Sequence, residues 1–260
     1  MRYKMIALMA FLLLLAFGYT VAPNSAEINL YDILSAPSSA HILGTDELGR
    51  DILARLIEGI MLSISVGVAV CVISAIIGTI VGVISAWLGG FWDSILMRIT
   101  DVFLSFPGVL IAIGIAALAG PSVTNIIIAL GFLGWVTFAR LARAGTLSVK
   151  EMEFVQAARL STVPNVTILT RYILPNITAP LIIECIFTIS GAMLAEAGLS
   201  FLGIGVQAPQ ASLGTMLREG ARYMLVSPHM VFFSGFALML LVLLLNLMGE
   251  AARSKLDVKK

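Results

Sequence analysis

Long apolar runs separated by short polar stretches dominate this chain, and that alternation predicts helices that cross a membrane. The first run follows Arg2 and Lys4 and covers residues 5–21. The remaining runs predict spans at residues 62–88, 98–119, 125–142, 177–203 and 230–248. Each run is continuous and lacks the period-two alternation of a barrel strand. We therefore expect an all-α integral membrane protein with about six transmembrane helices.

The first run allows two interpretations. It is long enough for a short span, and the small residues from Ala22 to Ala26 also resemble a signal-peptide cleavage site. Signal peptides are unusual on multi-spanning proteins, so we favour a retained N-terminal helix within residues 1–22. Both interpretations export the next segment.

That exported segment, residues 23–60, is polar and holds six of the fifteen acidic residues. Its centre reads HILGTDELGRD, a glycine-punctuated turn that leads into an amphipathic helix at the membrane surface. His41 is a candidate metal ligand, but a single histidine beside a turn is more often solvated, and we predict no metal site.

Residues 61–249 form the membrane core, and residues 250–260 form a basic tail. In the second run, small residues predict close helix contacts at Gly67, Gly78 and Gly82. Gly89-Gly90 should end that helix, residues 91–100 should be a short turn, and Phe106-Pro107 should kink the third span.

Three acids lie within or beside the apolar runs, where an unpaired charge is expensive and each acid is a functional candidate. We expect Asp101 to pair with Arg98 at the cytoplasmic end of the third span. Glu196 reads slightly more like a structural hydrogen-bonding group near the outer mouth than like a substrate contact. Glu184 is a candidate for specificity on the translocation path, or for pairing with a neighbouring subunit.

The stretch from residue 149 to 176 lies between two apolar runs but is too polar to span a membrane. Good helix formers predict a first helix to Leu160 that places Glu153, Gln156 and Arg159 on one side. Thr162 can cap a second short helix that should end at Leu174-Pro175. Two short helices joined by a bend make a shape that another protein can grip.

Composition excludes several classes of function. Hydrophobic residues make up 59% of the chain and charged residues 12%, which rules out a soluble domain. A net charge of +1 gives no indication of nucleic-acid binding. Cys71 and Cys185 both lie in apolar runs, without metal or disulfide spacing, and read as packing residues. No phosphate-binding G-x-x-x-x-G-K-[ST] sequence and no nucleophile–histidine–acid set occurs, so we expect no enzyme activity and no cofactor in this chain.

The basic residues predict the orientation. With Met1 in the cytoplasm, only four of the sixteen lysines and arginines lie outside: Arg50, Arg55, Arg218 and Arg222. The positive-inside rule supports this assignment, which puts both termini and the 149–176 loop in the cytoplasm of a cell-membrane protein.

The 149–176 loop resembles the EAA loop of ABC importer permeases. Gln156-Ala157-Ala158 stands for the family's Glu-Ala-Ala triplet, and Leu174-Pro175 closes the motif at the family's spacing. Gln156 replaces the acid and Thr162 takes the glycine position, where a threonine with positive φ would be strained, so we expect the bend to be made differently. The resemblance implies that the loop's residues couple to an ATPase: Glu153, Gln156, Ala157, Ala158, Arg159, Thr162, Arg171, Leu174 and Pro175.

Other stretches resemble one branch of that family, the permeases for dipeptides, oligopeptides and nickel, and among them the second, C-type subunit. LGTDELGRD matches the segment that precedes the core in this branch, through Gly44, Thr45, Asp46, Gly49, Arg50 and Asp51. RITDVFLSFPGVLIAI, AEAGLSFLGIGVQAP and NLMGEAARSKLD are similar to further segments of the branch, in the same order.

The resemblance implies a type I importer permease fold and a set of partners. These are a homologous permease subunit, two ATPase subunits that bind ATP and Mg, an extracytoplasmic substrate-binding protein and membrane lipid, with no nucleic acid. Closure of the ATPases would push the 149–176 helices and open a path between the two permeases. The short N-terminus favours nickel slightly over peptides as the substrate. The alternatives are a secondary transporter that uses the intramembrane acids, although no inverted repeat is visible, and a non-transporting membrane scaffold.

Overall fold

The computed structural model describes residues 25–257, and the expected first span at residues 5–21 lies outside this range. Within it the chain is helical, and its only β pairing is an isolated bridge between Thr45 and Asp51. The helices are α2 (Ile52–Leu88), α3 (Gly90–Leu104), α4 (Gly108–Ala119), α5 (Val123–Val149), α6 (Glu153–Leu160), α7 (Asn165–Thr167), the π-helical η1 (Ile168–Ile173), α8 (Leu174–Phe201), α9 (Leu213–Arg222) and α10 (His229–Asp257).

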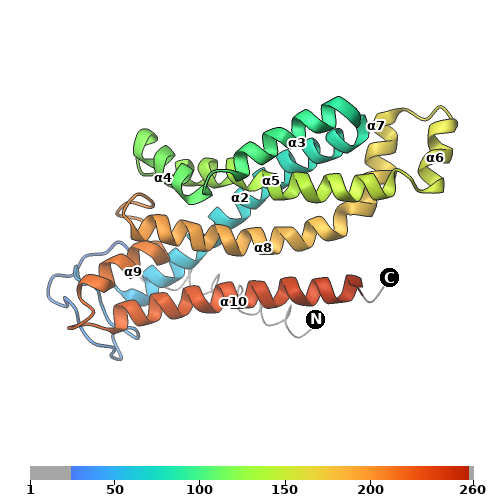
Figure 1. Ribbon diagram of the computed structural model, residues 1–260. Coiled ribbons are helices and arrows are strands. Elements are labelled where there is room, and N and C mark those ends of the chain that lie inside the picture. The colour runs from blue at the N-terminus through green and yellow to red at the C-terminus, as the bar shows by residue number, and fades with distance from the viewer. Residues whose placement is uncertain (1–24, 258–260) are drawn as a thin grey trace.

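Figure 1 shows an elongated bundle in which α8 and α10 run side by side in opposite directions. Helices α6 and α7 project at one end, where α10 also finishes. Helix α9 and the irregular segment before α2 lie at the other end. The two ends of the bundle therefore carry different structures, and the apolar helices connect them.

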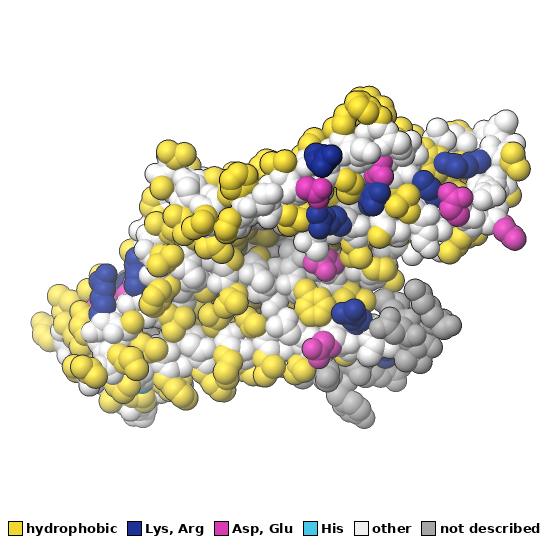
Figure 2. Space-filling view, viewed as in Figure 1, with side chains coloured by type: hydrophobic (Ala, Val, Ile, Leu, Met, Phe, Trp, Pro, Cys, Tyr) yellow, Lys and Arg dark blue, Asp and Glu magenta, His cyan; other side chains and the backbone are white. Residues whose placement is uncertain are grey.

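Four helical stretches of the described chain are long and apolar enough to cross a membrane: Ile52–Leu88, Val123–Val149, Asn165–Phe201 and His229–Lys255. A fifth span results if α3 and α4 are counted as one, and these two helices meet at an angle of 77°. The prediction of a multi-spanning all-α protein is confirmed. Figure 2 shows hydrophobic side chains along the middle of the visible face, with charged ones over α3, α5 and α6 and near α9.

The second span is longer than predicted because α2 begins at Ile52, not at residue 62. Asp51 caps the helix by accepting a hydrogen bond from the Ala54 backbone N–H at 3.0 Å. The added turns are buried, with Ile57 and Ile60 packing on Met193 of α8. The boundary between residues 60 and 61 therefore falls inside a helix, and the tail boundary at residue 250 likewise falls inside α10.

The expected turn at residues 91–100 is wrong, since these residues belong to helix α3. The break itself is where the sequence placed it. Gly89 and Gly90 have φ values of +67° and +51°, which a glycine adopts without strain. Pro107 separates α3 from α4, as the predicted kink requires.

Helix α2 is the central element and packs along α5 at two glycines. A Cβ atom on Gly78 would lie 2.2 Å from the Trp135 carbonyl oxygen, and one on Gly82 would lie 2.1 Å from the Ala139 carbonyl oxygen. Only glycine permits this backbone approach, so the prediction of close contacts in this helix is confirmed here. Cys71 of α2 and Cys185 of α8 are free thiols that contact each other where these two helices pack.

Candidate functional site

The first half of the 149–176 loop is the short helix α6, which projects at the end of the bundle (Figure 1). Its inner side carries Val155 and Ala158, which pack in a buried cluster with Ile168, Ile173 and other apolar residues. The outer side exposes Glu153, Gln156, Ala157 and Arg159. The triplet is therefore divided, because Gln156 and Ala157 face outward whereas Ala158 faces the core of the loop.

The bend after α6 is made by Thr162 itself. Its φ is +58°, in the left-handed region that the matching glycine of the family would adopt easily. Our expectation that the bend avoids a positive φ at Thr162 is wrong. A β-branched residue in this region stores roughly 1–3 kcal/mol of strain, which the packing of the loop must offset.

The second helix of the loop does not end at Leu174-Pro175, contrary to the prediction. Residues Asn165–Phe201 form one continuous helical stretch that passes through the π-helical turn η1 into α8. Proline removes one backbone donor and clashes with the preceding turn of an α-helix. The wider π turn just before Pro175 accommodates it, so that the loop and the span remain one rigid piece.

Two cationic side chains tie the loop to the end of α2. The Arg159 guanidinium carbon lies 4.2 Å from the centre of the Trp87 ring, a cation–π contact. Lys150, the residue directly after α5, donates from its Nζ atom to the Ala86 carbonyl oxygen at 3.0 Å. Arg171 is exposed, as is Pro175, and Leu174 is half-buried. These contacts hold α6 against the bundle while its outer side remains accessible.

Asp101 forms an ion pair with Arg140 of α5 at 2.6 Å. The prediction that Asp101 pairs with Arg98 is therefore wrong. Asp101 and Arg140 are distant in sequence, and both side chains are about half exposed. A second pair nearby joins Asp93 of α3 to Arg143 of α5 through two contacts of 2.6 Å. Two ion pairs therefore fasten α3 to α5.

Glu196 is fully buried and accepts hydrogen bonds from the Ser63 hydroxyl at 2.9 Å and the Ser200 hydroxyl at 2.8 Å. The Ser63 contact joins α2 to α8, which agrees with a structural role. Glu184 differs because it is half-buried and lines a cavity of about 670 Å³ between α5, α8 and the end of α10. Arg253 and Asn176 line the same cavity.

The segment LGTDELGRD folds into a compact ion-pair network at the opposite end. Arg50 Nε lies 2.7 Å from Asp46, and Arg55 of α2 contacts both Asp46 and, at 2.8 Å, Glu219 of α9. The buried carboxylates are neutralised by these two guanidinium groups. The network therefore fastens the segment to two helices.

The turn around this network depends on backbone geometry. Gly44 and Gly49 have φ values of +81° and +70°, and a Cβ atom on Gly49 would lie 1.7 Å from the Asn29 carbonyl oxygen. The Thr45 hydroxyl donates to the Asp32 carbonyl oxygen. His41 Nδ1 lies 2.9 Å from Asp51 Oδ2, so this histidine supports the helix cap and is not simply solvated.

Burial raises the pKa of Glu47 in the same segment. The neighbouring carboxylates of Glu219 and Asp46 act in the same direction, whereas the Glu47 backbone and Arg50 lower it. The Asp46 carboxylate beside it accepts hydrogen bonds from the backbone N–H groups of Leu48 and Arg50 and from Arg50 Nε.

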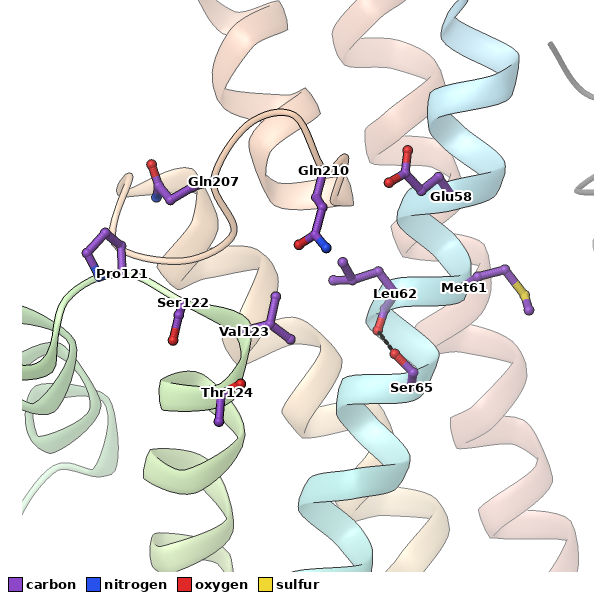
Figure 3. A pocket seen from close by; sticks show the side chains of 10 residues that line it. All are labelled: Glu58, Met61, Leu62, Ser65, Pro121, Ser122, Val123, Thr124, Gln207 and Gln210. Carbon is purple, nitrogen blue, oxygen red and sulfur yellow. Dashed lines mark hydrogen bonds between the residues drawn. The ribbon is translucent and has the colours of Figure 1, made fainter. Parts of the chain in front are cut away.

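A second cavity, of about 770 Å³, opens at the end of the bundle near this network. Figure 3 shows its wall built from α2, the turn between α4 and α5, and the loop between α8 and α9. Its lining residues are Glu58, Met61, Leu62, Ser65, Pro121, Ser122, Val123, Thr124, Gln207 and Gln210.

We call this cavity, at the end of the bundle opposite the 149–176 loop, the outer cavity. Sequence reasoning missed it because that reasoning ended the polar segment at residue 60 and started the helix afterwards. Extending the helix one turn backward would have placed Glu58, Leu62 and Ser65 on one face, at spacings of four and three residues. The remaining wall comes from distant loops and leaves no local signal.

The fold matches solved structures of one class of membrane protein. Two inward-facing structures of the MetNI methionine ABC transporter align with TM-scores of 0.62 and 0.60, at 17% and 16% identity. They cover 76% and 77% of this chain and 95% of each solved chain. The architecture is therefore that of a type I ABC importer permease.

The sequence then identifies the family. Residues 78–258 match the model described as "binding-protein-dependent transport system inner membrane component", and the chain belongs to this family. It is 38% identical over 256 residues to the dipeptide transport system permease protein DppC of Alkalihalophilus pseudofirmus, covering 98% of this chain and 84% of that protein. It is also 38% identical over 246 residues to the glutathione transport system permease protein GsiD of Escherichia coli, covering 94% and 81%.

This chain is thus a permease subunit of an ABC importer, a multi-pass membrane protein that works with ATPase and substrate-binding partners. It is a transport subunit and not an enzyme, because the ATPase of such a system is a separate subunit. Family membership also excludes the two alternatives, a secondary transporter and a non-transporting scaffold.

Proposed function

We propose that this chain forms one half of the translocation path of an importer for short peptides. Its relatives DppC and GsiD carry the names of dipeptide and glutathione systems, and both resemble it over nearly its whole length. That similarity is the observation that carries the substrate class. The slight sequence-based preference for nickel has no specific support among these relatives, so peptides replace it as our proposal.

The partners in this proposal are a homologous permease, which supplies the other half of the path, two ATPase subunits and an extracytoplasmic binding protein. ATP and Mg bind to the ATPases, and this chain holds no cofactor. Basic residues favour cytoplasmic termini and place the 149–176 loop on the same side as the ATPases. In Figure 1, the end of α10 lies toward the end of the bundle that carries α6, in support of this orientation.

The 149–176 loop transmits the movement of the ATPases in this proposal. Its outward residues Glu153, Gln156 and Ala157 provide the contact surface, while the inner side of α6 packs on the second helix. Because that second helix continues into α8, a push on α6 reaches the span without a flexible joint. Glu184 of α8 and its cavity would then change exposure as the span moves.

Among the three acids expected near the translocation path, Glu184 is the one we assign to it. Glu196 accepts hydrogen bonds from two serine hydroxyls, and Asp101 forms an ion pair with Arg140, which favours structural roles for both acids. Glu184 has no hydrogen bond or ion pair within residues 25–257 and faces a cavity, so it is available to a passing substrate.

Uptake by cells that lack only this chain tests the proposal. Labelled dialanine and labelled nickel are supplied in parallel, with cells that carry the restored gene as the control. We expect dialanine uptake to be lost and then restored, with nickel uptake unchanged. Loss of nickel uptake alone would reject the peptide assignment in favour of the metal.

A further inference from the structure

The outer cavity has the chemistry of a receiving site for one end of a peptide. It combines a single acidic group, two amide side chains, several hydroxyl groups and an apolar wall. Figure 3 shows Glu58 on α2 directed toward the loop that carries Gln210, while Gln210 extends from that loop toward α2. The groups belong to three separate parts of the fold, so only the folded protein brings them together.

Charge is the most selective property of this cavity. Among the described residues of its lining, Glu58 is the only ionisable one, and within residues 25–257 its Oε2 atom is buried without a hydrogen-bond partner. The nearest basic residue on the same helix, Arg55, forms ion pairs with Asp46 and Glu219. A buried carboxylate oxygen without a hydrogen bond is unfavourable, and a cationic group bound at the half-buried Glu58 carboxylate would reduce that penalty.

The type of cation follows from the other ligands. A divalent metal ion would require several oxygen or nitrogen ligands arranged around it, and Glu58 supplies the only carboxylate among the described residues that line the cavity. An ammonium group forms charge-assisted hydrogen bonds with one carboxylate and with neutral oxygens. The cavity therefore fits an ammonium better than a metal.

The amide groups extend this recognition along a peptide. Gln207 is held in place because its Nε2 donates to the Gly203 and Gly205 carbonyl oxygens at 3.2 and 3.1 Å. The exposed Gln210 amide makes no hydrogen bond within residues 25–257, so both its donor and its acceptor are available. A primary amide can pair with a peptide group, which also has one donor and one acceptor.

The apolar wall accommodates side chains without selecting among them. Leu62 and Val123 are half-buried and lie among the polar groups, on α2 and at the start of α5 (Figure 3). Contacts of this kind discriminate weakly between side chains, since one methylene changes binding by only about 1–3 kcal/mol. A site built in this way would accept many short peptides that have a free N-terminus.

We infer that the outer cavity receives the N-terminal ammonium of a short peptide at Glu58 and pairs the adjoining peptide group with Gln210. This inference rests on the proposed function and deepens it. The cavity would take over the peptide when it leaves the binding protein. Loss of this site should lower the amount of peptide transported for each ATP hydrolysed.

The test uses the complete importer in proteoliposomes, with its binding protein and labelled dialanine both saturating. In Glu58→Gln, we expect uptake to fall about tenfold while ATP hydrolysis stimulated by the binding protein changes less than twofold. Glu58→Asp should recover part of the uptake. Gln210→Ala, a change on an exposed loop, should reduce uptake a few-fold and provides a second test if Glu58→Gln fails to assemble. Glu27→Gln is the matched control, because it removes an exposed acid elsewhere in the outer segment.

The outcomes separate the inference from the proposed function. If the wild-type importer transported no dialanine, the peptide assignment and this inference would both fail. If the wild type transported dialanine and Glu58→Gln and Gln210→Ala did so equally well, the inference alone would be overturned. A parallel loss of uptake and ATP hydrolysis in Glu58→Gln, with normal assembly, would also contradict it, because that pattern indicates lost coupling and not a lost peptide site.

Discussion

The two ends of this permease are stabilised in opposite ways. The 149–176 loop is held by apolar packing of α6 on the following helix, and its charged side chains lie on the outside. The segment around Asp46 and Arg50 is held by buried ion pairs to α2 and α9. Apolar packing leaves a polar surface available for a partner, whereas buried ion pairs are directional and fix one geometry. The difference fits a loop that transmits force at one end and a fixed frame around the outer cavity at the other.

The ion-pair network should be the more fragile of the two regions. Replacing Arg55 by Met leaves Asp46 and Glu219 buried without this partner, and breaking a buried pair costs about 3–5 kcal/mol. We expect residues 25–51 to become sensitive to protease added from the outside, and uptake to be lost. Arg222→Met is the control, because Arg222 is exposed on the same α9 helix and has no ion pair in residues 25–257. Equal protease resistance in both variants would contradict this role of Arg55.

The 149–176 loop can be tested on its two sides separately. Ala157→Arg adds a charge to the outer surface, and we expect the ATPases to no longer co-purify while the melting temperature of the permease stays unchanged. Ala158→Arg buries a charge in the cluster of Val155 and Ile168, so the melting temperature should also fall. Uptake should drop more than tenfold in both. If Ala157→Arg assembled and transported normally, the proposed contact surface would be misplaced.

The strained bend of the loop predicts a gain in stability. Thr162→Gly removes a side chain that disfavours the observed φ of +58°, and we expect the free energy of unfolding to rise by about 1 kcal/mol. Thr167→Gly is the matched control, because Thr167 is helical and glycine should lower the free energy of unfolding there by a few tenths of a kcal/mol. Denaturation of the purified permease measures both. A loss of stability in Thr162→Gly would show that the bend is not strained.

The smallest expected effect concerns the pH dependence of the outer segment. Because burial raises the pKa of Glu47, the folded segment holds this proton more tightly than the unfolded one, and the stability contribution of Glu47 falls as pH rises through the raised pKa. Glu47→Gln should therefore stabilise the segment at neutral pH by about 1 kcal/mol or less, and the gain should vanish in acid. Hydrogen exchange of residues 25–51 at several pH values measures the difference. A gain that grew in acid would contradict the assigned direction.

Much of the fold was predictable because a bilayer imposes a strong and local constraint. Runs of apolar residues mark the spans, and glycine and proline mark their breaks at Gly89 and Pro107. Boundaries at polar residues were less predictable. The start of α2 at Ile52 depends on the cap by Asp51 and on packing against α8, which no local pattern reveals.

The candidate sites divide in the same manner. The residues of the 149–176 loop and of LGTDELGRD could be selected from the sequence because they form continuous motifs. The outer cavity could not, since Glu58, Val123 and Gln210 come from three separate parts of the chain. The partners of ion pairs could not be predicted from the sequence either, as the contact of Asp101 with Arg140 shows.

The sequence by itself determined that this chain crosses a membrane several times and which family it resembles, and it supplied the positive-inside argument behind the proposed orientation. These properties depend on composition and order along the chain. The tertiary structure alone decided that Thr162 takes a positive φ, that the 149–176 loop continues into α8, and that the Glu58 Oε2 atom has no hydrogen-bond partner within residues 25–257. These properties depend on which distant groups meet, and the free energy of those contacts is absent from any local stretch of sequence.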